Sequence, residues 1–185
     1  MAEAIPARIT LRRSFWKLML SFDDSLAANV LGAAGVLGNF AWPLFRRRES
    51  MLASQALACA FFTAHFVMIG ATTGAAMTVL AGLQALAAIP LGSRPGFRKL
   101  YLSMLPVIGA AMLASWHGLP SFFAALGLAL TSVGRYQLDA TRFRALVLTS
   151  IPAWSVHNVL TGSIPGLCSD ALTLASGIWM LSRRG

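Results

Sequence analysis

Polar residues able to do chemistry gather in one apolar stretch near the end of the chain, WSVHNVLTGSIPG, which runs from Trp154 to Gly166. His157 and Asn158 stand side by side in it, and Asp170 follows shortly afterwards. A carboxylate that accepts a hydrogen bond from an imidazole fixes its tautomer, and such a pair can bind a polar solute or carry a proton. These residues, with the neighbouring indole of Trp154, are therefore candidates for a functional site.

A second histidine, His65, stands in a related stretch, FTAHFVMIGATTG. Each histidine is followed by a glycine five residues later and by another glycine four residues after that. At an offset of 92 residues, the longer segment Phe61–Leu86 shares five identities in 26 positions with its counterpart around His157. Gln55 and His65 are the candidate site residues of the first copy. Thr78 aligns there with Asp170, so we expect proton chemistry in the second copy alone.

Composition indicates a membrane protein whose partner is the lipid bilayer. Hydrophobic residues make up 57% of the 185 residues and charged residues only 11%, against about 25% charged in soluble domains. The net charge is +9, but no basic stripe alternates with aromatic residues, which excludes nucleic acid as a partner. The spacing of histidine, cysteine and acidic residues matches no metal, cofactor or nucleophile motif, so we expect no metal, no cofactor and no enzyme.

Seven apolar runs are long enough to cross a bilayer as helices, which need about 20 residues each. Turn-forming segments such as RRRES, GSRPGFRK, HGLP and GSIP separate them. The sequence therefore predicts an all-α integral membrane protein with seven transmembrane helices, and Pro152 should kink the sixth. The expected spans are Leu26–Phe45, Met51–Gly70, Gly74–Gly92, Leu100–Trp116, Pro120–Tyr136, Phe143–Gly162 and Gly166–Leu181.

The repeat and the span count together predict a 3+1+3 arrangement, because an odd unit plus one linker helix gives two triple-helix bundles in parallel orientation. Basic residues mark the cytoplasmic side of inner-membrane proteins, and the predicted orientation is N-out/C-in. The loops on the predicted inner side and the C-terminal tail hold eleven basic residues, whereas the opposite loops hold none: Arg46, Arg47, Arg48, Arg94, Arg98, Lys99, Arg135, Arg142, Arg144, Arg183 and Arg184.

The basic N-terminal segment conflicts with this orientation. We expect it to be an amphipathic tail lying on the bilayer surface, with translation from Met19 as the alternative. The predicted organisation is a tail over residues 1–25, a first three-helix repeat over 26–92, a linker helix over 93–119, a second repeat over 120–182 and a basic tail over 183–185.

The predicted hairpin between the sixth and seventh spans brings His157 and Asp170 to similar depth. At the helical rise, His157 lies about 7.5 Å below the end of the sixth span, and Asp170 about 6 Å below the start of the seventh. We therefore expect the two side chains to touch. The pair either binds a solute or a proton, or it only pins the hairpin, and both interpretations stay open.

The segments LPVIG, HFVMIGATTG and WSVHNVLTGSIPG, the last followed by Asp170, resemble the YgjV-like family of bacterial inner-membrane proteins over roughly Leu26–Arg184. The resemblance implies a small multi-pass protein of the bacterial inner membrane. It supplies a location and not a mechanism. Members tend to begin close to the first span, which again indicates Met19.

Two functions remain. The first is a transporter that moves a small polar solute through a site between the two three-helix bundles, by analogy of topology with SWEET-type transporters. The second is a membrane scaffold or assembly subunit that transports nothing and whose polar residues only hold helices together. A homodimer is compatible with either function.

Overall fold

Helices make up all of the regular structure that the computed structural model describes, which is residues 26–91 and 97–183, with side chains over 26–90 and 103–183. A first helix covers residues 26–41. It is followed by the 3-10 helix η1 (Trp42–Leu44) and by α2 (Arg48–Met68), α3 (Thr72–Leu91), α4 (Phe97–Ala114), α5 (Leu119–Arg135), α6 (Ala140–Leu148), α7 (Ile151–Thr161) and α8 (Ile164–Ser182). The predicted all-helical class is confirmed.

Some predictions fall outside the described residues. They are the amphipathic tail over residues 1–25 with its alternative start at Met19, the first residues of the linker, the last two residues of the basic tail, and the basic side chains at 94, 98, 99 and 184.

The sixth apolar run departs from the expected single helix over residues 143–162. Thr149 and Ser150 form a turn that divides it into α6 and α7. Pro152 lies in the first turn of α7, where its missing N–H costs no hydrogen bond, and prolines disfavour helix in the residue before them. Ser150 Oγ accepts a hydrogen bond from Thr131 Oγ1 at 2.9 Å, which ties the break to α5. The expected kink is therefore a complete break.

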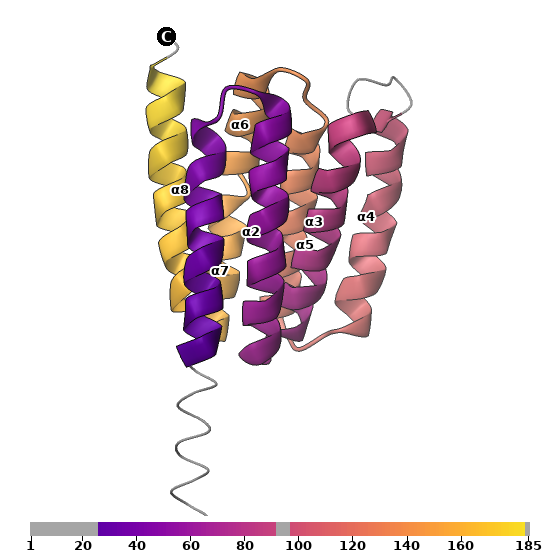
Figure 1. The fold of residues 1–185 in the computed structure, drawn as a ribbon. Helices are drawn as coiled ribbons and strands as arrows, with labels where there is room; N and C mark the ends of the chain where they lie inside the picture. Colours follow the sequence, from indigo (N-terminus) through magenta and orange to yellow (C-terminus); the bar gives the residue numbers. More distant parts are fainter. Residues whose placement is uncertain (1–25, 92–96, 184–185) are drawn as a thin grey trace, which may run out of the picture.

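Two glycines close the hairpins that carry the candidate site. Gly70, between α2 and α3, has φ +76°, and Gly162, between α7 and α8, has φ +68°. Glycine enters this left-handed region without the Cβ penalty of other residues. Ser163 then starts α8, because its Oγ accepts the N–H of Gly166 at 3.1 Å. Both turns lie at the same end of the bundle, which we call the glycine end (Figure 1).

The helices run up and down side by side in one bundle (Figure 1). The helix over residues 26–41 with α2 and α3 is called the first unit, and α5 with α6, α7 and α8 the second unit. Helix α4 lies at the flank, where it packs on α3 and α5. The end opposite the glycine end, with η1 and the start of α6, is called the arginine end.

Three of the described helices are long and apolar enough to cross a membrane: Arg48–Met68, Thr72–Pro90 and Ile164–Ser182. Ser103–Ala114 and Leu119–Arg135 are shorter apolar helices. Large apolar side chains point outward from several helices, with exposed fractions of 70% for Leu37 and 71% for Ile164. An apolar outer surface of this kind suits contact with lipid rather than with water.

Candidate functional site

A cavity of about 100 Å³ lies between the two units. That volume has room for a few water molecules or one small solute. None of its lining residues belongs to α4 within the described part of the chain. They are Asn39, Trp42, Gln55, Cys59, Phe62, Phe66, Thr78, Ala81, Thr131, Arg135, Val147, Ser150, Ile151, Trp154, Asn158, Gly166, Ser169, Asp170 and Thr173.

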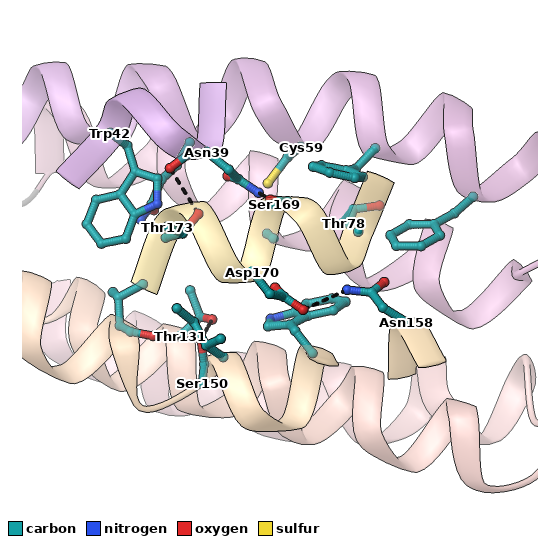
Figure 2. A pocket seen from close by; sticks show the side chains of 18 of the residues that line it. Asn39, Trp42, Cys59, Thr78, Thr131, Ser150, Asn158, Ser169, Asp170 and Thr173 are labelled. Atoms are coloured by element: carbon teal, nitrogen blue, oxygen red, sulfur yellow. Dashed lines mark hydrogen bonds between the residues drawn. The ribbon is translucent and has the colours of Figure 1, made fainter. Parts of the chain in front are cut away.

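Hydrogen bonds across the cavity join the first helix to α8. Asn39 Nδ2 donates to Ser169 Oγ at 2.8 Å, and Thr173 Oγ1 donates to the backbone oxygen of Asn39 at 3.1 Å. Figure 2 shows these groups above the cavity, with Thr131 and Ser150 on the opposite wall. The cavity is thus walled by hydroxyl and amide groups from both units, with aromatic rings between them.

Asp170 faces this cavity from α8. Its Oδ2 accepts hydrogen bonds from Ser155 Oγ and from Asn158 Nδ2, both at 2.9 Å, and Figure 2 shows the second of these bonds. The amide of Asn158 must present its nitrogen to the carboxylate, because its oxygen could not donate. Asn158 Oδ1 consequently turns toward Gly166, where it is buried without a hydrogen-bond partner.

The predicted contact between His157 and Asp170 is wrong. His157 Nδ1 donates instead to the backbone oxygen of Pro120 at 2.8 Å. Its Nε2 is buried without a partner and abuts Gly74, where a Cβ would lie 2.5 Å from it. Successive helical residues are about 100° apart, so the face of α7 that turns Asn158 toward Asp170 turns His157 toward α3 and α5.

His65 is also held by two groups outside the cavity. Its Nδ1 donates to the backbone oxygen of Ala28 at 2.8 Å, and its Nε2 then accepts from Ser163 Oγ at 2.8 Å. The second bond links α2 of the first unit to the start of α8 in the second. Neither histidine lines the cavity, and each is held by a backbone oxygen of a neighbouring helix.

The remaining candidates, Gln55 and Trp154, do line the cavity. Gln55 Oε1 accepts from Arg135 Nε at 3.3 Å and Nη2 at 3.2 Å. Trp154 lies edge-on to His157, with ring centroids 5.8 Å apart. The structure therefore brings Asp170, Asn158, Trp154 and Gln55 to one cavity.

Arg135 is the main lining residue that the sequence analysis missed, because it was counted as a loop charge. It is 2% exposed, and its Nη1 donates to Gln84 Oε1 at 3.0 Å. Its position inside the predicted fifth span was the available signal. The small hydroxyls of Ser169, Thr131 and Thr173 carried no such signal, because serine and threonine are common throughout the spans.

Two further arginines close the arginine end by crossing between the units. Arg48 of α2 donates to the backbone oxygens of Arg135 and Gln137 at 3.0 Å each. Arg144 of α6 donates to those of Pro43 at 2.8 Å and Phe45 at 3.0 Å. Arg48 and Arg144 are buried, although the sequence analysis counted them among the loop charges. We call these four bonds the arginine clasp.

Several contacts recur at the offset of 92 residues that relates His65 to His157. Each histidine bonds to the backbone oxygen 37 positions before it. The acceptors of Arg144, at 43 and 45, and those of Arg48, at 135 and 137, are related by the same offset.

Two further pairs of equivalent contacts, one of hydrogen bonds and one of ring packing on glycine, are related by the same offset of 92 residues. The bond from Thr63 Oγ1 to Thr78 Oγ1, at 2.9 Å, matches that from Ser155 to Asp170. The packing of Phe62 on Gly35 corresponds to that of Trp154 on Gly127.

Comparison with known protein families identifies a match that covers most of the chain. The family model Imp-YgjV, described as a bacterial inner membrane protein, matches residues 26–184. No curated protein and no solved structure matches the chain.

Proposed function

The chain belongs to the Imp-YgjV family and resides in the bacterial inner membrane, and from this premise we propose that it moves a small polar solute across that membrane. The observation that carries the proposal is the cavity between the two units, which has polar groups in its wall and lies between contacts that join the units at both ends of the bundle. A solute would enter and leave as these contacts alternately open.

The recurring contacts support an architecture of two copied units. The same offset relates backbone turns, histidine bonds and interhelix hydroxyl bonds, which chance similarity of two histidines does not explain. We propose a 3+1+3 arrangement of seven spans, with α4 as the linker and the two units in parallel orientation. The sixth span then consists of α6 and α7.

The charge distribution supports an N-out/C-in orientation. The exposed basic side chains Arg46, Arg47, Arg142 and Arg183 lie toward the arginine end, while the loops at the glycine end carry no lysine or arginine. Basic residues favour the cytoplasm, so the arginine clasp would form the inner closure. A fluorescent reporter that folds only in the cytoplasm should be active at the C-terminus, and inactivity there would reverse the orientation.

The outer closure would be the bond between His65 and Ser163 together with close backbone packing. A Cβ on Gly32 would lie 2.6 Å from the ring of Pro165, so the first helix and the start of α8 approach as closely as glycine allows. Alternating access requires that such contacts break one end at a time. In the structure the two units are joined at both ends of the bundle.

A native thiol provides the test. The chain has two cysteines, of which Cys59 lines the cavity and Cys168 is exposed. In Cys168→Ser, Cys59 is the single thiol. Transport predicts that a small charged methanethiosulfonate reagent modifies Cys59 in folded protein within native membranes. A static scaffold with a sealed interface predicts modification only after denaturation, and that result would contradict the transport proposal.

A further inference from the structure

The carboxylate of Asp170 faces the cavity. The groups that donate hydrogen bonds to it carry no positive charge. Both donors to its Oδ2, Ser155 and Asn158, are neutral. Within the described side chains no lysine or arginine forms a salt bridge with it. An ionised carboxylate at this depth in a membrane protein is costly, and such groups commonly pair with a charge or mark a substrate pathway.

The fold does not need this charge. In the first unit the equivalent position is Thr78, and its hydroxyl accepts from Thr63 as Asp170 accepts from Ser155, with the same distance of 2.9 Å. A neutral hydroxyl therefore suffices to join the two helices of a unit. Thr78 and Asp170 both line the cavity, so the carboxylate gives the second unit a charged group there that the packing does not require.

Arg135 lines the same cavity but is too far away to balance Asp170. By the helical rise, Asp170 lies about 9 Å from the start of α8, whereas Gln55, which holds Arg135, lies about 20 Å from the end of α2. Both reference points are at the glycine end, so the two charges are roughly 10 Å apart along the bundle. A small α-amino acid would have to reach both groups at once, and competition by glycine tests whether it does.

The surroundings of Asp170 suit an organic cation. The aromatic rings of Trp154, Phe62 and Phe66 line the cavity with it, and aromatic faces attract ammonium groups. Asn158 lines the cavity beside the carboxylate and holds it through its Nδ2. An alkali cation would need several oxygen ligands in place of its water, and only the hydroxyl and amide groups of the wall could supply them, so competition by sodium and potassium distinguishes the two cations.

We propose that Asp170 binds the ammonium group of a small protonated amine in the cavity between the two units. Asn158 and Ser155 orient the carboxylate, and Trp154 packs on the carbon skeleton of the amine. The inference rests on the proposed function and names the class of solute for it. The cavity volume of about 100 Å³ limits the solute to a few heavy atoms.

The test is binding of methylammonium to the purified full-length protein in detergent, measured by calorimetry at constant ionic strength. Wild type should bind methylammonium, and Asp170→Thr, which places the residue of the first unit at this site, should bind at least tenfold more weakly. Asp139→Thr is the matched control, because it removes an exposed carboxylate that caps α6, and threonine also caps helices. It should bind as wild type does.

Competition of other solutes with methylammonium for the wild-type protein tests the assignment of an amine site without any variant. Sodium, potassium and glycine should not displace methylammonium. Equal binding of sodium, displacement by glycine, or full binding by Asp170→Thr would each overturn the assignment of an amine site, as would the absence of methylammonium binding.

Failure of this inference is separable from failure of the transport proposal. Modification of Cys59 in membranes without methylammonium binding would leave transport standing and remove the amine. Methylammonium binding with a fully protected Cys59 would instead indicate an amine sensor that does not transport.

Discussion

Replacing Ala71 with serine should stabilise the protein. The second unit has a serine hydroxyl at the equivalent position, Ser163, and the first unit has none. Ser163, 92 residues later, accepts the N–H of Gly166 at 3.1 Å and bonds to His65 Nε2 at 2.8 Å. Ala71 has no hydroxyl, and His157 Nε2 is a buried atom without a partner. Position 71 directly precedes α3, so the new hydroxyl should cap that helix and donate to His157.

The size of the effect follows from the two bonds. A serine cap in place of alanine contributes about 1 kcal/mol, and a net intramolecular hydrogen bond about 0.5–1.5 kcal/mol. Ala71→Ser should therefore raise the free energy of unfolding by about 1–2 kcal/mol. Ser163→Ala removes both bonds and leaves His65 Nε2 buried without a partner, so it should cost about 2–4 kcal/mol.

The assay is reversible unfolding in mixed micelles with increasing SDS, followed by tryptophan fluorescence from the five native tryptophans. A double-mutant cycle with His157→Leu separates the two contributions. In the His157→Leu background Ala71→Ser should keep only the capping part of its gain. An equal gain in both backgrounds, or no gain in wild type, would refute the equivalence of positions 71 and 163.

Two further changes test the close packing and the arginine clasp. Gly166→Ala should lower the free energy of unfolding by about 1–3 kcal/mol, because the new Cβ would overlap the Asn158 amide that holds the cavity carboxylate. The control is Gly109→Ala, which has open space around it and should leave the free energy of unfolding unchanged or raise it by up to about 1 kcal/mol. Arg144→Met should cost about 2–4 kcal/mol, because it leaves the buried carbonyl oxygen of Pro43 and the partly buried one of Phe45 without donors. It should also speed modification of Cys59 from the arginine end. The exposed Arg142→Met is the control and should change neither quantity, and equal rates in the two arginine variants would exclude the clasp as a closure.

Much of the fold was predictable because apolar runs and turn residues act locally. The glycines at 70 and 162 close turns at the predicted places, and the ends of most helices fall within a few residues of the apolar runs. The break before α7 was predicted only as a kink. A proline can bend or end a helix, and here a contact from Thr131 on another helix accompanies the break, which no local pattern reveals.

The site was less predictable than the fold, because the depth of a residue along its helix does not determine the direction in which its side chain points. Sequence position gives the depth of His157 and Asp170 in a hairpin, and that estimate alone suggested a contact. Direction depends on how α7 is rotated about its axis, and the bond from His157 to the backbone oxygen of Pro120 marks that rotation. The neighbour Asn158 occupies the face that was assigned to the histidine. Arg135 was missed for a similar reason, since its direction rather than its position makes it a cavity residue.

The differences between the two units indicate where function is concentrated. The first unit has a hydroxyl pair, Thr63 with Thr78, and a fully bonded histidine. At the matching places the second unit has a carboxylate, Asp170, and a histidine with one free nitrogen. Buried groups without partners are rare in native proteins, and those that occur call for an explanation. In the first unit the equivalent groups are neutral and have hydrogen-bond partners, and the same helix packing forms. The carboxylate of α8 and the free histidine nitrogen of α7 are therefore not required by packing. In the proposed transport scheme the second unit would therefore recognise the solute, and the first unit would be the frame against which the second unit moves.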